Sequence, residues 1–236
     1  MLSVIIPTYN EEENIEKCLL SLQNQTIPRD KYEIIVVDGQ STDKTVVLAK
    51  KYADKIILQK SNGIGGARND GVAVAKYDLI ATTDADCIIP ENWLDKITKA
   101  FEDKELIVVS GKVKLIDTSP AINLTYWLVE KAWYFLSITN LSHFLCGANT
   151  AFRKRQFMEV GGYSDIPVLD DYELSLRIKK KGKIKYIRPI FVYYSARRIK
   201  IQGISKLIDL WVFNWARLNM GLPVKKASYA KQNYGE

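Results

Sequence analysis

The feature that most constrains the fold is an alternation, in the first half of the chain, of short apolar runs with segments of helical spacing. The apolar runs, which are rich in β-branched residues, are residues 3–6, 33–37, 55–58 and 78–83. Helical spacing of apolar residues occurs in residues 11–24, 46–49 and 92–101, and residues 63–75 are predicted to be a glycine-rich loop that enters a helix. Continuous apolar strands that alternate with helices are typical of a parallel sheet covered by helices on both faces. We therefore expect an α/β fold.

The second half of the chain has a less regular pattern. Strand-like runs occur at residues 106–110, 112–116, 147–152, 184–186 and 191–194. Predicted helices cover residues 155–160, 170–181 and 203–221, together with an aromatic stretch within 121–146. Because no repeat or flexible linker separates the halves, we expect one domain over residues 1–221. Its segments are residues 1–110 and 111–221, and residues 222–236 are expected to form a basic tail.

Charge is unevenly distributed along the chain. The net charge is +7, but residues 1–150 hold 16 Lys and Arg against 20 Asp and Glu, whereas residues 151–236 hold 18 against 7. The basic half is either a solvated lysine-rich surface or a face for an anionic partner such as phosphates or lipid headgroups. The acidic first half and the absence of an RNA-binding motif argue against a nucleic-acid partner.

The cysteines and the first residues indicate a cellular compartment. Cys18, Cys87 and Cys146 are odd in number and form no CxxC pair, which favours a reducing compartment over a disulfide framework or a zinc ribbon. The start of the chain lacks the basic region and the long apolar run of a signal peptide. We therefore expect a cytoplasmic protein.

The aromatic stretch within residues 121–146 allows two interpretations. Glu130 and Lys131 interrupt it, and the uncharged remainder is shorter than the ~20 residues that a membrane span needs. The stretch is therefore either a core helix with an aromatic side, or an in-plane helix at a membrane surface or a wall for a lipid-like ligand. The second interpretation predicts peripheral contact with the inner face of a membrane.

Polar clusters follow directly after three of the predicted strands, at Thr8–Glu11, Asp38–Asp43 and Asp84–Asp86. The carboxyl ends of parallel strands meet at one edge of a sheet, where such folds bind ligands. Two carboxylates at Asp84 and Asp86 can share a hard cation, Mn²⁺ or Mg²⁺, that neutralises a diphosphate leaving group. The alternative is that these acids only form a turn.

Two further positions have a functional and a structural interpretation. Asp38 can accept hydrogen bonds from a base or a ribose, although Ser41, Thr42 and Asp43 beside it are typical caps of the next helix. Asn10 is likewise a candidate cap for the helix over residues 11–24. Arg68 follows a glycine-rich stretch and can bind a phosphate or form an internal salt bridge.

The second half contributes one acid pair and one arginine pair. Asp170 and Asp171 begin a predicted helix, where the helix dipole favours acids, and one of them can serve as a general base. Arg197 and Arg198 follow a predicted strand and either clamp an anion or are solvated. The only histidine, His143, lies among apolar residues and is expected to be packed, so Ser-His-Asp hydrolysis has no support.

Taken in order, these segments resemble the family 2 inverting glycosyltransferases. The first half contributes Val4–Glu12, Val36–Asp43, Ala67–Asn69 and Asp84–Asp86, and the second half contributes Gly147–Arg153 and Leu169–Leu174. The resemblance covers roughly residues 2–200. It implies a GT-A fold, Rossmann-like, with a mixed and mostly parallel central sheet. It also implies transfer from a nucleoside-diphosphate sugar with inversion, assisted by Mn²⁺ or Mg²⁺.

The resemblance also implies roles for individual residues. The nucleotide-sugar site takes Pro7, Thr8, Tyr9, Glu11, Asp38, Arg68, Asp84 and Ala85, and the metal ligands are Asp86 and Asp84. Asp171 falls on the general base that deprotonates the acceptor hydroxyl, and Asp170 stands where glutamate is usual. The donor sugar and the acceptor are expected to contact Gly147, Ala148, Asn149, Asp170, Arg197 and Arg198.

Two departures from the family pattern qualify these expectations. No histidine follows the last predicted strand, which leaves the third protein ligand of the metal unassigned. The QxxRW motif of processive members is absent, which favours single addition. A UDP-sugar is the favoured donor because Asp38 suits the imide of uracil, and the acceptor is a glycan, a lipid-linked molecule or a small molecule. The alternatives are a sugar-phosphate nucleotidyltransferase and a non-catalytic nucleotide-sugar binder.

Overall fold

A computed structural model of the chain describes residues 1–224, apart from the side chains at positions 198, 202, 204, 205 and 207. The strands are β1 (Leu2–Thr8), β2 (Tyr32–Asp38), β3 (Lys55–Leu58), β4 (Leu79–Thr82), β5 (Cys87–Ile88), β6 (Leu106–Ile116), β7 (Thr150–Arg153) and β8 (Lys183–Ser195). The helices are α1 (Ile15–Gln23), α2 (Thr45–Ala49), α3 (Gly63–Val74), α4 (Trp93–Ala100), α5 (Pro120–Ile138), α6 (Lys154–Glu159), α7 (Asp170–Ile178), α8 (Arg197–Gln202) and α9 (Ile204–Asn219). Two short 3₁₀ helices are Arg29–Lys31 and Gly147–Asn149. None of the helices described in residues 1–224 is long and apolar enough to span a bilayer.

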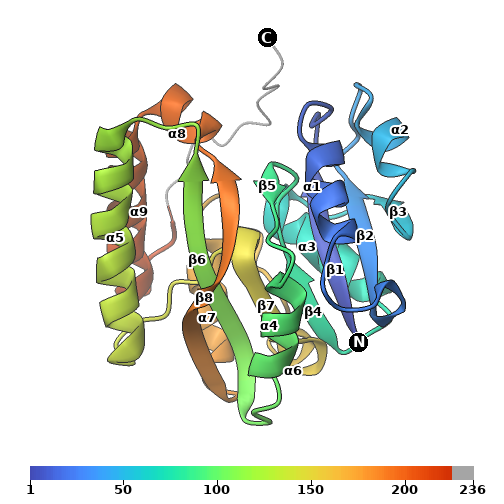
Figure 1. Cartoon of the computed structure of the whole chain (residues 1–236). Coiled ribbons are helices and arrows are strands. Elements are labelled where there is room, and N and C mark those ends of the chain that lie inside the picture. Colours follow the sequence, from blue (N-terminus) through green and yellow to red (C-terminus); the bar gives the residue numbers. More distant parts are fainter. Residues whose placement is uncertain (225–236) are drawn as a thin grey trace.

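All of these strands belong to one sheet in the order β3-β2-β1-β4-β7-β6-β8-β5 (Figure 1). Strands β3, β2, β1 and β4 are parallel, as the alternation of strands and helices predicts. Strand β7 lies antiparallel between β4 and β6, while β6 and β8 run parallel to each other. The expectation of a mixed, mostly parallel sheet is therefore confirmed.

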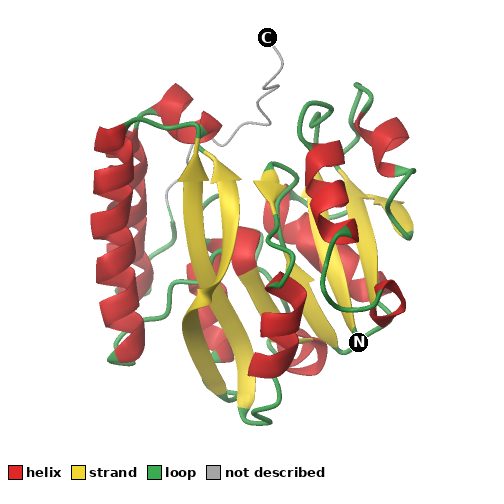
Figure 2. Cartoon of the chain, in the orientation of Figure 1, coloured by secondary structure: helices red, strands yellow, loops and turns green. Residues whose placement is uncertain are grey.

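The strands are apolar on both sides because each side of the sheet packs against helices (Figure 2). In β1, Val4 and Ile6 join one core cluster, whereas Ile5 between them joins the other. The first cluster contains the buried sides of α1 and α4, and the second contains residues of α3, α6 and α7. Helices α5 and α9 lie together beyond β6 and β8, at the left of Figure 1.

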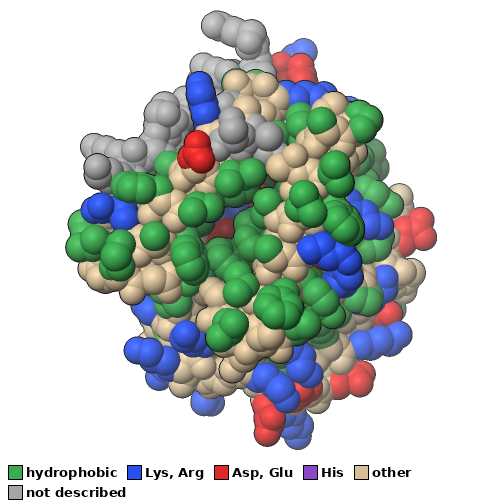
Figure 3. Space-filling model, turned by 90° about the vertical axis from the view of Figure 1, so that its left-hand side faces the viewer, with side chains coloured by type: hydrophobic (Ala, Val, Ile, Leu, Met, Phe, Trp, Pro, Cys, Tyr) green, Lys and Arg blue, Asp and Glu red, His purple; other side chains and the backbone are tan. Residues whose placement is uncertain are grey.

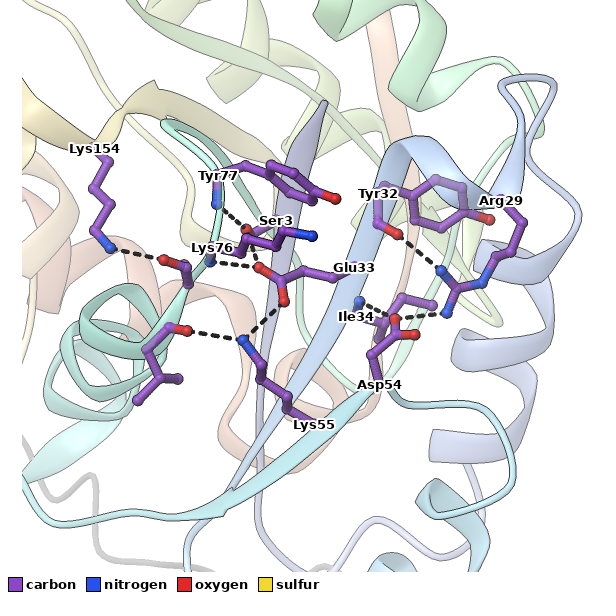
Figure 4. Close-up of polar contacts among 12 residues, drawn as sticks. Ser3, Arg29, Tyr32, Glu33, Ile34, Asp54, Lys55, Lys76, Tyr77 and Lys154 are labelled. Atoms are coloured by element: carbon purple, nitrogen blue, oxygen red, sulfur yellow. Dashed lines mark hydrogen bonds and ion pairs between the residues drawn. The ribbon is translucent and has the colours of Figure 1, made fainter.

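A buried glutamate ties the strands together at the amino end of the parallel sheet (Figure 4). Glu33 accepts hydrogen bonds from the Ser3 hydroxyl at 2.6 Å and from the Lys76 backbone N–H at 2.6 Å, and it pairs with Lys55 at 3.0 Å. A buried carboxylate needs such partners, since its desolvation is otherwise costly. These contacts lie at the end of the sheet opposite to the predicted ligand crevice, so they brace the sheet without occupying that crevice.

Several element boundaries differ from the sequence-based expectation. The glycine-rich stretch forms the first turns of α3 rather than a loop, and a Cβ atom at Gly65 or Gly66 would clash with Tyr163 or Ser61. The two predicted strands over residues 106–116 are one continuous β6, and the two over 184–194 are one β8. The last predicted helix, over residues 203–221, is α9, and a short helix α8 that was not predicted precedes it and meets it at Gly203, with φ +80°. Residues 225–236 of the predicted basic tail lie outside the described residues.

Candidate active site

The carboxyl ends of β1 and β2 place a threonine beside an aspartate. Thr8 and Asp38 are cross-strand partners, and both are buried. One carboxylate oxygen of Asp38, Oδ2, accepts the backbone N–H groups of Gln40 and Ser41 at 3.1 Å each. Within residues 1–224, Asp38 Oδ1 and Thr8 Oγ1 have no hydrogen-bond partner. Because unpaired buried polar atoms are costly, this pair is ready to receive donors from a ligand.

The loops after β1 and β2 are fastened to each other, which overturns two predicted helix caps. Asn10 has a left-handed backbone, φ +51°, and does not cap α1, which begins at Ile15. Its backbone N–H donates to the Ser41 hydroxyl at 2.9 Å, and its Oδ1 accepts the Thr42 N–H at 2.8 Å. Ser41 and Thr42 therefore hold the neighbouring loop instead of capping α2. Asp43 accepts the Thr45 backbone N–H at 2.9 Å.

Arg68, on α3, lies among the acids Asp84, Asp170 and Asp171. Its side chain is only 3% exposed and donates to Asp84 Oδ1 at 2.7 Å, while Asp170 Oδ2 is 4.0 Å away. The internal salt bridge is thus the interpretation that the geometry supports, with Asp84 as its main partner. A Cβ atom at Gly147 would lie 2.2 Å from the Arg68 Cζ atom, so only glycine fits beside the guanidinium.

Asp170 and Asp171 begin α7, directly after Leu169, whose backbone is left-handed with φ +60°. Strain of this kind persists where surrounding contacts hold it, often at functional sites. The Gly147 backbone N–H donates to Asp171 Oδ2 at 2.9 Å, and Asp171 Oδ1 is buried without a hydrogen-bond partner among the described residues. Burial and the neighbouring charge of Asp170 raise the pKa of Asp171 to about 7, although Arg68 opposes the shift. A carboxyl with this pKa is suited to take up a proton near neutral pH.

Asp86 lies opposite Asp84 in the same turn and has a different arginine beside it. Arg197, at the start of α8, lies 3.6 Å from Asp86 Oδ2 and 2.6 Å from Glu11 Oε1. Glu11 also accepts a hydrogen bond from the Asn14 amide at 2.8 Å. Both acids of the Asp84–Asp86 pair therefore face an arginine, and Arg197 connects the end of β8 to the loop after β1.

The remaining predicted site residues fall into three groups. Pro7 is buried within β1, Tyr9 is half-buried directly after it, and Ala85 is buried between the two acids. Ala148 and Asn149 are buried, and the Asn149 side chain bonds Trp93 Nε1 at 2.8 Å and the Lys112 carbonyl at 2.8 Å. The Asn149 amide is therefore held by the framework, and the contact of Asn149 with the donor sugar or the acceptor stays a prediction. The side chain of Arg198 lies outside the described residues.

The structure adds Thr83, a residue that sequence reasoning missed. Its hydroxyl is buried directly before Asp84 and has no hydrogen-bond partner in the part of the chain that the structure describes. A polar residue at the end of an otherwise apolar strand is the signal that could have identified it. His143, in contrast, is packed as expected: it is buried and contacts Asn140 Oδ1 at 2.7 Å and the Ser137 hydroxyl at 3.3 Å.

A mixed sheet of this order, with an Asp-x-Asp turn after β4 and an acid pair opening α7, defines a fold of the GT-A class. The chain matches the family model described as Glycosyl transferase family 2 over residues 3–161 and belongs to this family. Among solved structures, it resembles the mannosyltransferase PcManGT from Pyrobaculum calidifontis in complex with GDP-Man and Mn²⁺, with a TM-score of 0.64 and 26% identity. That match covers 81% of this chain and 56% of the other. A second similar structure, S. aureus TarS in complex with UDP-GlcNAc, has a TM-score of 0.65 and 21% identity, covering 82% and 58% of the two chains.

Curated proteins give the same picture. The chain is 28% identical over 220 residues to the poly(ribitol-phosphate) beta-glucosyltransferase of Bacillus spizizenii, which covers 80% of this chain and 34% of that protein. It is 36% identical over 118 residues to the glycosyltransferase AglE of Haloferax volcanii, covering 48% and 39% of the two proteins. The chain thus spans less than half the length of these two relatives.

Proposed function

We propose that the protein is an inverting glycosyltransferase that moves a sugar from a nucleoside-diphosphate sugar to an acceptor hydroxyl or phosphate. The observation that carries this proposal is the carboxyl of Asp171. One of its oxygens is fixed by the Gly147 N–H, the other is buried without a partner among the described residues, and its pKa is about 7. Membership of glycosyl transferase family 2 supports the same reaction class.

The proposed division of labour follows the two parts of the sheet. Residues 1–110 would bind the donor, with Thr8 and Asp38 at its base and ribose, and residues 111–221 would bind the acceptor. A uridine nucleotide is favoured because Asp38 Oδ1 can accept the imide N–H of uracil. The complex of TarS with UDP-GlcNAc supports a uridine donor, whereas the PcManGT complex contains GDP-Man. The absence of a QxxRW motif supports single addition.

The residues at the Asp84–Asp86 turn fit a divalent cation. Carboxylate oxygens are the ligands that Mn²⁺ and Mg²⁺ prefer, and Mg²⁺ sites often use one or two carboxylates together with substrate phosphates. Residues 1–224 contain no group of three or more His, Cys, Asp or Glu side chains arranged to hold a metal. The donor diphosphate would therefore have to supply the remaining ligands. A bound cation would offset the charge that develops on the departing diphosphate.

The chain's own residues account for the transfer to a hydroxyl. The acceptor oxygen forms a bond to the anomeric carbon while the bond from that carbon to the diphosphate oxygen breaks, and the diphosphate keeps the electron pair. The acceptor proton passes to Asp171 Oδ1. Arg68, between Asp84 and Asp170, keeps a positive charge within the acid cluster and opposes the rise in the Asp171 pKa. Inversion follows if the acceptor attacks from the side opposite the diphosphate.

A nucleotide screen tests the donor site. We would measure thermal shifts with UDP-, GDP-, CMP- and dTDP-sugars, each with and without Mn²⁺, and expect a metal-dependent stabilisation by a UDP-sugar. Asp171→Asn should keep this stabilisation and lose transfer by about 10²–10⁴-fold, the usual contribution of a general base. Asp30→Asn, an exposed change on the first 3₁₀ helix, is the matched control. Protein that is folded but stabilised by none of these nucleotides would contradict the proposal.

A compartment can also be proposed. The three cysteines are free, and Cys18 and Cys87 are buried, which supports a reducing, cytoplasmic environment. Contact with the inner face of a membrane would bring the enzyme to a lipid-linked acceptor. The helices that could make this contact are α5 and α9.

A further inference from the structure

Helices α5 and α9 present large hydrophobic side chains to solvent. We define the α5–α9 face by its most exposed members: Leu124, Trp127, Leu128, Phe135 and Ile138 on α5, with Val212 and Phe213 on α9. The five on α5 are each 47–59% exposed. Figure 3 shows this side of the molecule, where hydrophobic side chains gather around a hollow with an acidic side chain at its base. Contiguous apolar patches on a protein surface are candidates for interaction sites.

The exposed residues of α5 form a stripe at helical spacing. Positions 124, 128, 135 and 138, with the half-buried Lys131 between them, recur every three or four residues, so they share one side of the helix. The opposite side faces the protein: the Tyr134 ring packs at a tilt against the Tyr186 ring, with centroids 5.9 Å apart, and Tyr126 packs against the first core cluster. The helix is thus apolar on both sides, and only one side is covered by the described residues.

On α5, the acidic side chain is buried in the protein, whereas the basic one lies beside the exposed Trp127. Glu130, the only acid of α5, is 2% exposed and is turned into the protein, where it pairs with Arg188 at 3.2 Å and Lys112 at 3.9 Å. Lys131, the only cation of α5, lies over the Trp127 ring at 5.3 Å. Such a lysine can keep its charged end in water while its stem follows an apolar surface.

Neighbouring helices add to the positive charge. Lys200 on α8 and Lys206 on α9 are exposed, and Arg217 on α9 lies 5.6 Å over the Phe213 ring. Asp209 is the exposed acid among the described side chains of α9. An apolar face with tryptophan and phenylalanine beside cations matches the chemistry of an anionic bilayer surface. A second copy of the same face fits less well, since it would set cations against cations.

The α5–α9 face is also joined to the candidate base by a continuous column of aromatic rings. Tyr172, which follows Asp171, stacks on Phe144 at 4.8 Å, and Phe144 stacks on Trp133 of α5 at 5.2 Å. Trp133 in turn contacts Trp211 of α9 at 5.9 Å. The orientation of the face relative to Asp171 is therefore fixed by packing.

We propose that the α5–α9 face docks the protein on an anionic phospholipid bilayer, so that its acceptor is a membrane-bound amphiphile. The inference that the acceptor is a membrane-bound amphiphile rests on the proposed transferase function, whereas the docking does not. The cations are expected to attract the membrane, and the apolar stripe to enter its interfacial region.

Vesicle flotation tests the docking without any substrate. We expect the protein to bind vesicles of phosphatidylcholine mixed with phosphatidylglycerol, to bind phosphatidylcholine alone more weakly, and to lose binding as salt increases. Trp127→Gln/Phe135→Gln should reduce vesicle binding at least about tenfold. A tenfold loss corresponds to roughly half to all of the free energy gained when one large apolar side chain is buried. The matched control is Val47→Gln/Leu58→Gln, which changes two exposed hydrophobic residues on α2 and β3.

The outcomes separate the two proposals. Equal binding by the Trp127/Phe135 variant and the Val47/Leu58 control, or no binding to either type of vesicle, would overturn the docking. A dimer in solution that only the Trp127/Phe135 change dissociates would assign the face to a second copy and would overturn it as well. Unchanged nucleotide-induced stabilisation of the variant shows that it is folded. Vesicle binding without transferase activity would count against the proposed function and leave the docking intact.

Discussion

Replacement of Asp171 by asparagine should stabilise the protein at neutral and alkaline pH while it slows transfer by about 10²–10⁴-fold. The folded state raises the pKa of this carboxyl from 3.8 to about 7, chiefly through burial and then through Asp170. A raised acid pKa means that the folded protein binds the proton more tightly than the unfolded chain does. The associated stability is present below pH 4 and is lost as pH rises towards 7. Asparagine cannot ionise, so the variant does not suffer this loss.

The shift sets the size of the effect. Each pKa unit corresponds to about 1.4 kcal/mol, and between pH 5 and pH 8 the wild-type protein should lose about 2–3 kcal/mol that Asp171→Asn retains. The amide oxygen of asparagine can still accept the Gly147 N–H, so the local hydrogen bond is kept.

The assay is denaturant unfolding at pH 5, 6, 7 and 8, with Asp30→Asn as the exposed control. Because Asp170 and Asp171 titrate as a pair, Asp170→Asn is measured alongside them. We expect the difference in the free energy of unfolding between Asp171→Asn and wild type to grow with pH. The difference between Asp30→Asn and wild type should stay the same at every pH. A pH-independent difference between Asp171→Asn and wild type would refute the assignment of a neutral-range pKa to this carboxyl. So would a larger pH effect from Asp170→Asn.

Three further changes test other parts of the site. Gly147→Ala should destabilise the protein by about 1–3 kcal/mol, because the new Cβ would lie 2.2 Å from Arg68 Cζ. In an Arg68→Ala background the same change should cost little stability. If thermal unfolding shows that Gly147→Ala costs the same in both backgrounds, the clash with Arg68 is refuted. Asp38→Ala should weaken UDP binding at least about tenfold in calorimetry, as expected for a lost hydrogen bond to a charged group, and an unchanged affinity would remove Asp38 from the base site. Arg197→Ala should strengthen Mn²⁺ binding in the absence of nucleotide, because it removes the cation beside Asp86 and Glu11. Electron paramagnetic resonance measures this binding, and Arg155→Ala on α6 is the control. Equal Mn²⁺ affinity of the two variants would show that Arg197 does not compete with the metal.

The sheet was predictable from the sequence because its strands carry their own signal. Runs such as residues 34–37 are buried on both sides, so every position is apolar and no other element explains them. The positions of Asp38 and Asp84 followed from the same argument, since acids directly after parallel strands meet at one edge. The antiparallel insertion of β7 was not predictable, because its partners β4 and β6 are distant in sequence and residues 147–152 carry no register signal.

The local capping rules failed where the loops bind one another. Asn10 and Ser41 have the residue types of helix caps, but their polar groups bond across the β1 and β2 loops instead. Tertiary contacts between residues about 30 positions apart override local preference there, and no pattern within either loop signals the partner. The pairing of Arg197 with Glu11 was hidden for the same reason, because it joins residues 186 positions apart.

The charges of the site explain why metal and donor are expected to bind together. Asp84 and Asp86 each have an arginine beside them, but the two arginines differ in freedom: Arg68 is buried on α3, whereas Arg197 is 22% exposed on the short helix α8. A divalent cation arriving alone would meet a cluster whose acids already have partners, and it would find two carboxylates as protein ligands. A donor diphosphate would supply the oxygen ligands that the cation lacks. It would also offer Arg197 a new anionic partner in place of Asp86 and Glu11. The ion pairs of Arg197 with Glu11 and Asp86 would therefore compete with a metal, and a donor diphosphate would favour the exchange of Arg197 for a cation.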